Sequence, residues 1–165
     1  HLWHLTTGVT LAKLDAHSMA IRGVKVLNDG RFLSWSWDKT LRLWDGSTGD
    51  ILAVLEGHQQ SLIGATVLND GRILSWSRDA TLRLWDGKTG ASLMTLTGHS
   101  KSIEGAKVLK DGRILSWSAD NDLRVWDPTT GECLFTLNGH DKLVNGAMEL
   151  SEERILSWSS KLLRV

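Results

Sequence analysis

The chain has 165 residues, enough to bury the core of one domain, and its 19 basic and 19 acidic residues leave no net charge that would indicate a nucleic-acid partner or an anionic membrane. A single cysteine, Cys133, excludes an internal disulfide framework and suits a reducing compartment, and no apolar run approaches the ~20 residues that a membrane span needs. We therefore expect a single domain over residues 1–165, located in the cytoplasm, with no cofactor.

A repeat of 41 residues organises the whole chain. Tryptophan and histidine recur at this interval without a gap, at Trp3, Trp44, Trp85 and Trp126 and at His17, His58, His99 and His140. The last repeat is one residue shorter, because SWSADNDLRV at 116–125 is answered by SWSSKLLRV at 157–165. The chain is therefore read as four blade-length repeats.

Each repeat is predicted to form four short strands and no helix. In the first complete repeat, the turn Asn28-Asp29-Gly30 lies between apolar runs and predicts a hairpin, since glycine accepts a positive φ. A second turn at Asp38 leads into LRLW at 41–44, and a third turn over 45–49 leads into ILAVLE at 51–56. Apolar residues occupy both alternating faces, so we expect neighbouring repeats to cover each sheet on both sides.

Three motifs recur in this order: GH, S-x-S-x-D and WD, as at 57–58, 75–79 and 85–86. This combination resembles the WD40 repeat, and the likeness extends over essentially the whole chain. The resemblance implies an all-β propeller of four-stranded antiparallel blades, acting as a protein-interaction scaffold rather than as an enzyme.

In that family a hydrogen-bonded tetrad of histidine, serine, aspartate and tryptophan locks each blade. The likeness carries three such sets over to this chain: His17, Ser34, Asp38 and Trp44; His58, Ser75, Asp79 and Trp85; His99, Ser116, Asp120 and Trp126. A fourth set is incomplete, because His140 and Ser157 are followed by Lys161 or Leu162 where aspartate belongs, and Ser151-Glu152-Glu153 replaces the N-D-G turn. Buried indole, hydroxyl and imidazole groups need such partners, or each costs about 1 to 3 kcal/mol.

Two features depart from the family pattern or invite another explanation. Tryptophan stands between the two serines at 35, 76, 117 and 158, and we expect these indoles to fill space between blades. Cys133 lies in an apolar stretch and is predicted to be a small buried residue rather than a reactive thiol.

Catalytic and metal chemistry are not expected. Serine, histidine and aspartate recur in successive units beside a tryptophan, whereas a hydrolase needs one activated nucleophile facing a pocket. Histidines in equivalent positions of successive blades lie too far apart to share one metal ion, and the chain has no C-x-x-C pair.

The positions that vary while the framework repeats are the candidates for binding a protein or peptide. One such position precedes each turn aspartate, and another follows each repeated histidine by two residues. The resemblance places the first of these on the upper surface, and we predict a partner-binding upper face made of Trp37, Arg78, Ala119, Ser160, Met19, Gln60, Lys101 and Lys142. Trp37 and Arg78 are the residue types most often found as interface hot spots, although extra packing is an equal alternative for Trp37.

The four repeats allow more than one way of closing a ring. A strand around Val9 to Leu14 at the N-terminus and strands one to three at the C-terminus would together make one blade. We expect two copies to join into an eight-bladed ring; the alternatives are a fragment of a longer propeller chain and a strained four-bladed monomer. The alternative function is a ligand-binding or hydrolytic propeller with a pocket on the central channel.

Overall fold

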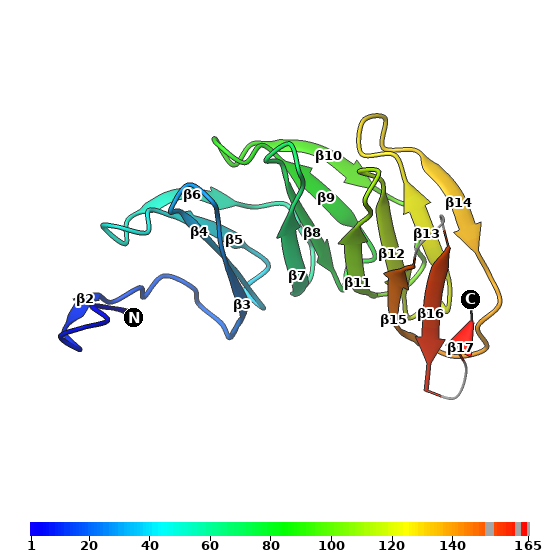
Figure 1. Ribbon diagram of the computed structural model, residues 1–165, viewed down its shortest axis with the longest axis horizontal. Helices are drawn as coiled ribbons and strands as arrows, with labels where there is room; N and C mark the ends of the chain where they lie inside the picture. Colours follow the sequence, from blue (N-terminus) through cyan, green and yellow to red (C-terminus); the bar gives the residue numbers. More distant parts are fainter. Residues whose placement is uncertain (151–153, 161–162, 165) are drawn as a thin grey trace.

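The computed structural model describes residues 1–150, 154–160 and 163–164. These residues form short antiparallel sheets that stand side by side in an open arc, and the two ends of the chain lie at opposite sides of the molecule (Figure 1). No helix occurs among the described residues, so none of them forms a helical membrane span. The arrangement is that of propeller blades around an unclosed ring.

Three sheets have four strands each, in the order of the chain or its reverse. Blade 1 consists of β3 (Ile21–Val26), β4 (Phe32–Ser36), β5 (Leu41–Trp44) and β6 (Ile51–Leu55). Blade 2 consists of β7 (Leu62–Val67), β8 (Ile73–Ser77), β9 (Leu82–Trp85) and β10 (Ser92–Leu96). Blade 3 consists of β11 (Ile103–Val108), β12 (Ile114–Ser118), β13 (Leu123–Trp126) and β14 (Cys133–Leu137).

Two smaller sheets stand at the ends. The N-terminal hairpin consists of β1 (Leu2–Trp3) and β2 (Thr10–Ala12), the latter within the predicted strand, and the terminal blade consists of β15 (Val144–Glu149), β16 (Ile155–Ser159) and β17 (Leu163–Arg164). The structure thus has three complete blades and a partial fourth. The predicted replacements at Ser151-Glu152-Glu153 and at Lys161 or Leu162 lie outside the described residues.

The repeated turns explain why every blade has the same register. In blade 1 the carboxylate of Asp38 accepts hydrogen bonds from the backbone N–H and the hydroxyl of Thr40, at 3.0 and 2.7 Å. These bonds hold the intervening Lys39 at a φ of 72°, a left-handed conformation that a side chain seldom adopts without local support. Ala80 and Asn121 occupy the same place with φ values of 67° and 76°. The turn aspartate therefore fixes the second hairpin of each blade.

The core lies between blades rather than within them. Leu33, Leu41 and Leu55 of blade 1 pack against Leu62 and Trp85 of blade 2 in one buried cluster. Corresponding clusters join blade 2 to blade 3 and blade 3 to the terminal blade. A single blade has no separate core, so each depends on its neighbours for stability.

Three of the tryptophans between paired serines, Trp35, Trp76 and Trp117, pack against the clusters between blades as predicted, and their cross-strand neighbours show how they fit. Trp35 packs against the cluster between blades 1 and 2 and lies over Gly23, its cross-strand partner in β3. A Cβ atom on Gly23 would collide with the indole ring, and the same holds at Gly64 under Trp76. Glycine on the inner strand therefore makes room for each of these large side chains.

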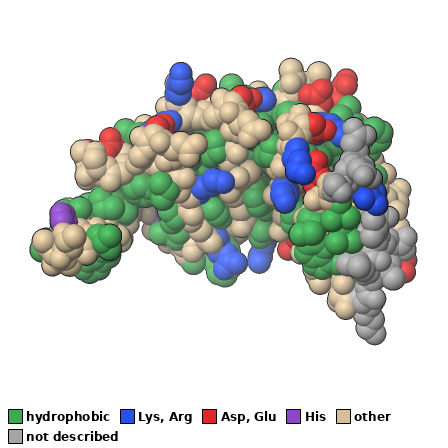
Figure 2. All heavy atoms as spheres, viewed as in Figure 1, with side chains coloured by type: hydrophobic (Ala, Val, Ile, Leu, Met, Phe, Trp, Pro, Cys, Tyr) green, Lys and Arg blue, Asp and Glu red, His purple; other side chains and the backbone are tan. Residues whose placement is uncertain are grey.

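Both ends of the arc expose apolar residues (Figure 2). Ile21, Val24 and Val26 on blade 1 are exposed, and all five residues of β14 on blade 3 are exposed as well. The prediction that Cys133 is buried is therefore wrong. Cys133 lies at the start of the outer strand of blade 3, and its equivalents Ile51 in β6 and Ser92 in β10 are exposed as well.

Candidate functional site

The second blade shows the geometry of the repeated polar network most fully. Trp85 Nε1 donates to Ser75 Oγ at 2.8 Å, and Ser75 Oγ lies 2.8 Å from His58 Nε2. On the other side of the ring, His58 Nδ1 lies 2.8 Å from a carboxylate oxygen of Asp79. The same oxygen accepts the backbone N–H of Gln59 at 2.8 Å. Four side chains, two from strands β8 and β9 and two from the segments that precede β7 and β9, are thus joined into one chain of hydrogen bonds.

Blades 1 and 3 repeat this geometry. The serine–histidine distances are 2.7 Å for His17 with Ser34 and 2.8 Å for His99 with Ser116. The histidine–aspartate distances are 2.7 Å to Asp38 and 2.9 Å to Asp120. Tryptophan donates to the serine at 2.9 Å from Trp44 and at 2.8 Å from Trp126. In the terminal blade, His140 Nε2 lies 2.8 Å from Ser157 Oγ.

One arrangement of protons satisfies every member of the network. The indole N–H donates to the serine oxygen, the serine O–H donates to a neutral Nε2, and the Nδ1–H donates to the carboxylate. Burial lowers the pKa of His99 below its ordinary value and outweighs the opposing effect of the Asp120 carboxylate. Burial by itself would raise the pKa of Asp79, but hydrogen bonds from His58 and Thr81 hold it well below its ordinary value. Neutral histidine beside ionised aspartate is the state that these shifts favour.

This network contains the residue types of a hydrolytic triad, but a substrate cannot reach its serine. Ser75 and Ser116 are completely buried, and the oxygen that would attack a substrate already accepts the indole hydrogen bond. A nucleophile needs room for a substrate and an oxyanion site beside it. The network therefore supports the blades rather than presenting a reactive group.

The predicted upper-face residues come together in pairs at one edge of the blades. Ser36 Oγ donates to the carbonyl oxygen of Met19 at 3.1 Å, and Trp37 N donates to the carbonyl oxygen of Ala20 at 3.0 Å. Ser77 Oγ makes the equivalent bond to Gln60 at 3.0 Å, and Ser118 Oγ to Lys101 at 3.1 Å. In blades 1 to 3, the varied position before the turn aspartate is thereby fixed beside the varied position after the histidine.

These residues differ in their exposure. Met19, Gln60, Arg78, Lys101, Lys142 and Ser160 are exposed, whereas Trp37 and Ala119 are half-buried. The indole N–H of Trp37 is covered and has no hydrogen-bond partner among the described residues. Trp37 is therefore held as a fixed platform rather than as a freely projecting side chain.

Two guanidinium groups approach the ring of Trp37. The Cζ atom of Arg22 lies 5.2 Å from the ring centroid, and that of Arg78 lies 5.9 Å from it. Within the described part of the chain, neither arginine makes an ion pair or a hydrogen bond through its guanidinium group. The sequence reasoning missed Arg22. The signal was there, because its equivalents are Ile63, Glu104 and Asn145, so this position also varies while the framework repeats.

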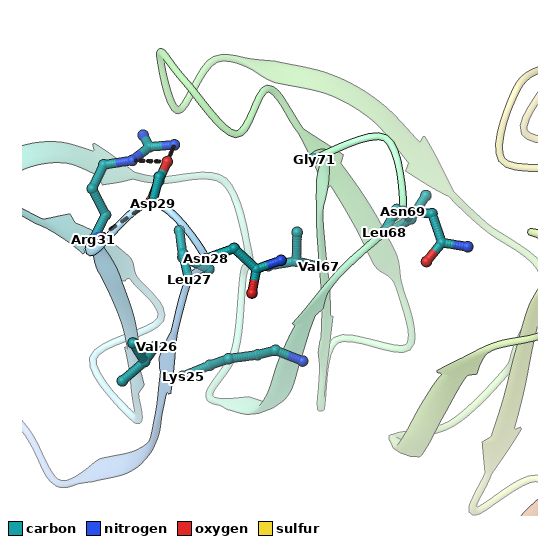
Figure 3. A pocket seen from close by; sticks show the side chains of 10 residues that line it. All are labelled: Lys25, Val26, Leu27, Asn28, Asp29, Arg31, Val67, Leu68, Asn69 and Gly71. Atoms are coloured by element: carbon teal, nitrogen blue, oxygen red, sulfur yellow. Dashed lines mark hydrogen bonds and ion pairs between the residues drawn. The ribbon is translucent and has the colours of Figure 1, made fainter.

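The opposite edge of the blades contains a cavity of about 450 Å³ between blades 1 and 2 (Figure 3). Lys25 extends from β3 toward the second blade and donates to Thr66 Oγ1 at 3.0 Å, and Asp29 pairs with Arg31 at the rim. A cavity of about 290 Å³ lies between blade 3 and the terminal blade and uses the equivalent positions, including Asp111 and Arg113. Because both cavities are lined by equivalent positions of the repeat, we interpret them as gaps between adjacent blades. The described residues contain no cluster of three or more potential metal ligands.

Comparison with solved structures supports the fold. The crystal structure of the WD40 beta propeller domain of Doa1 matches with a TM-score of 0.79 and 28% sequence identity, covering 91% of this chain and 51% of that chain. The present chain thus spans about half the length of the Doa1 chain it matches. A search of curated proteins gave no match.

The family model for the WD domain, G-beta repeat, matches three times, at residues 8–45, 49–86 and 90–127. Each match starts at the outer strand of one sheet and continues through the three inner strands of the next, so the sequence repeat joins adjacent blades. The three matches cover more than half of the chain and follow the motifs that build the buried networks. The protein therefore belongs to the WD40 repeat family.

Proposed function

We propose that this protein is a non-catalytic interaction scaffold that binds an acidic segment of a partner protein on its upper face, at Trp37, Arg22 and Arg78. The observation that carries this proposal is the placement of two unpaired guanidinium groups against one indole ring. WD40 propellers generally bind proteins or peptides, and the upper-face residues are the ones that change from blade to blade.

The chemistry of the cluster favours a carboxylate-rich ligand. A guanidinium that approaches an aromatic ring keeps N–H donors available for a carboxylate, and it can bind one through two parallel hydrogen bonds. The ring of Trp37 restricts how Arg22 and Arg78 move, so less conformational entropy is lost when a ligand binds. The nearest acidic side chain of the turn, Asp38, is already committed to His17.

Binding of peptide arrays that contain acidic, neutral and basic segments tests this function. The Trp37→Ala/Arg78→Ala double variant should lose most of its binding to acidic peptides, while Lys107→Ala, which removes an exposed charge elsewhere on blade 3, should bind like the wild-type protein. Unchanged binding by the double variant refutes the upper-face site. Stronger binding of a single-stranded oligonucleotide than of any peptide replaces the protein partner with a nucleic acid.

The alternative function, a ligand-binding or hydrolytic propeller, has less support. The cavity beside Lys25 has an equivalent between blade 3 and the terminal blade, as expected for architecture rather than for a dedicated site. Each complete blade keeps its serine hydroxyl buried. A hydrolysis screen with ester, peptide and phosphoester substrates should therefore give no activity that depends on Ser75.

We further propose that two copies assemble in the cytoplasm into an eight-bladed ring with twofold symmetry. The support is the exposure of apolar sheet faces at both ends of the arc, where the equivalent interior faces are buried. Each copy would provide three complete blades and the parts of one more. Sedimentation equilibrium should give twice the chain mass of 18.3 kDa, and a well-folded monomer over the micromolar range would exclude the ring.

A further inference from the structure

We infer that the partner segment bound on the upper face is an extended peptide with an acidic, an apolar and a basic residue in this order, the two charged residues lying about six positions apart. Arg22, Ile63 and Glu104 contact these three residues in turn. This inference rests on the proposed upper-face site at Trp37, Arg22 and Arg78, and it adds a requirement for a basic residue.

The first strand of each blade contains a β-bulge. In blade 1, Ile21 pairs with Ser36 and Gly23 pairs with Trp35, so Arg22 is the extra residue between two paired ones. The same register shift in β7, β11 and β15 makes the extra residues Ile63, Glu104 and Asn145. A bulge interrupts the regular ladder and changes the direction of a side chain, which is why bulges often stand beside binding sites. Each blade thus presents one side chain at an equivalent, irregular position.

Backbone hydrogen bonds place these bulges at the upper face. The N–H of Trp37 donates to the carbonyl oxygen of Ala20 at 3.0 Å, and Ala20 is two residues before Arg22. Blades 2 and 3 repeat this bond at 3.1 and 2.9 Å, from Arg78 to Ser61 and from Ala119 to Ser102. The bulged residues of blades 1 to 3 therefore lie next to the positions that are predicted to bind a partner.

The bulged residues form a row across the arc. The first strands lie along its concave side, where β3 adjoins β7 and β7 adjoins β11 (Figure 1). From blade 1 to blade 3 the row is positively charged, apolar and negatively charged in turn. The residue before the bulge is apolar and the residue after it is glycine in every blade, so the chemistry changes at the bulged position between constant neighbours. A row of this kind can distinguish one end of a ligand from the other.

Glu104 is a charge without a partner at the far end of this row. It is half-buried, and within the described part of the chain its carboxylate makes neither an ion pair nor a hydrogen bond. Arg22 is at the other end, and the uncharged Ile63 lies between them. Partial burial reduces screening by water and salt, so a cation from a ligand would interact favourably with this carboxylate.

The spacing of the row determines the length of the ligand. Packed sheets stand about 10 Å apart, and an extended chain advances about 3.3 Å per residue. The two blade steps from Arg22 to Glu104 therefore correspond to about six residues, and the midpoint of the ligand lies over Ile63. Opposite charges at the two ends fix the register of the peptide on the row.

A uniformly acidic segment fits this row less well than a segment with mixed charge. Its acidic residue at blade 1 would bind Arg22, but another carboxylate two blades further on would lie beside Glu104. Like charges in contact disfavour a wrong ligand, and this repulsion contributes to specificity. The acidic part of the partner is therefore restricted to blades 1 and 2, and a basic residue follows it at blade 3.

Fluorescence anisotropy with labelled peptides tests the order and the spacing. The first peptide has acidic, apolar and basic residues with the charges six positions apart, the second has glutamine in place of the basic residue, and the third has the charges two positions apart. Each is made in both N-to-C directions, because the row fixes the spacing of the charges and not the direction of the chain. In one direction the first peptide should bind about 5-fold more tightly than the other two, as one partly exposed ion pair provides.

The results separate this inference from the proposed function. Equal binding of the three peptides, with all of it lost in Trp37→Ala/Arg78→Ala, overturns the inference while the proposed upper-face site stands. Binding that does not depend on Trp37 and Arg78 overturns both.

Charge reversal at Glu104 gives the sharpest result. Glu104→Arg should bind a peptide that is acidic at both ends more tightly than the first peptide, and blade 1 already has arginine at this position, so the fold accommodates it. Glu132→Arg, which makes the same change in charge just before β14, is the matched control and should keep the wild-type preference. Glu104→Gln, which has nearly the same shape, should remove the difference between the first two peptides. An unchanged preference in both Glu104 variants, or the same reversal in Glu132→Arg, overturns the inference.

Discussion

Blades 1 and 2 have nearly the same sequence pattern, yet the faces that they turn toward the N-terminus differ. Ile21 of blade 1 is 51% exposed, whereas its equivalent in blade 2, Leu62, is completely buried. Val24 is exposed in the same way and its equivalent Ala65 is buried. The difference comes from the neighbour: blade 1 covers blade 2, but only a two-stranded hairpin stands before blade 1. Burial in this fold is therefore a property of adjacent blades rather than of one repeat.

The largest expected effect contrasts the two faces. Leu62→Ala should lower the free energy of unfolding by about 2 to 5 kcal/mol, because it leaves a cavity in the cluster between blades 1 and 2. Ile21→Ala should change it by less than about 0.5 kcal/mol in the monomeric chain, since a half-exposed side chain loses little contact. Urea denaturation at low protein concentration measures both. Equal effects would show that the exposed face of blade 1 is covered in solution even at that concentration.

A somewhat smaller effect contrasts a complete network with the terminal one. Ser75→Ala leaves the indole N–H of Trp85 and the Nε2 atom of His58 without their shared partner, so it should cost about 2 kcal/mol. Ser157→Ala removes the contact to His140 alone and should cost less in the monomer. Thermal unfolding followed by circular dichroism distinguishes the two. A loss of stability in Ser157→Ala as large as that in Ser75→Ala would contradict the idea that the hydrogen bond from the indole of Trp85 accounts for the larger cost at Ser75.

Glycine substitutions should have equal effects in blades 1 and 2. Gly23→Ala and Gly64→Ala each place a methyl group against an indole of the same blade, so each should destabilise by about 1 to 3 kcal/mol. The collision does not involve a neighbouring blade. Denaturation midpoints that fall in Gly64→Ala but not in Gly23→Ala would indicate that blade 1 is loosely packed internally.

The smallest expected effect is a dependence of stability on pH. Burial lowers the pKa of His99 in the folded protein, so the unfolded chain binds the proton first and stability declines as the pH falls below about 6.5. The lowered pKa of Asp79 makes a second loss of stability begin below about pH 4, when the carboxylate of the unfolded chain takes up a proton. Denaturation at a series of pH values measures both stages. Asp79→Asn should weaken the second stage and leave the first, and a stability that rises below pH 6 would contradict both assignments.

The 41-residue period and its motifs predicted much of the fold. Four-stranded antiparallel sheets, the turns at Asp29 and Asp38 and the absence of helices among the described residues all follow from local signals that each repeat carries. The network of His58, Ser75, Asp79 and Trp85 was predicted as a set because the family resemblance assigns the four positions together. The structure adds the hydrogen-bond distances between these four side chains and shows that His58, Ser75 and Trp85 are buried, so the network stabilises the blade.

Other features could not be predicted from the repeat. Cys133 was expected to be buried from its apolar surroundings, but it lies at the start of an outer strand, a position that is exposed at Ile51 and Ser92 as well. Arg22 varies between repeats and could have been singled out for that reason, but only the folded chain places it against Trp37, which lies in the turn after β4, 15 residues further along the sequence. The exposed position of Trp3 likewise depends on strands that do not adjoin it in the sequence.

The sequence by itself determined the blade: its period, its turns, its polar network and the glycine under each tryptophan, because all of these arise from contacts within one repeat. Only the tertiary structure decided which of those blades have covered faces, where the Trp37 cluster forms and which strands stand at the ends without partners. The physical reason is that the apolar core of this fold lies between blades, so its completion depends on neighbours that no single repeat contains.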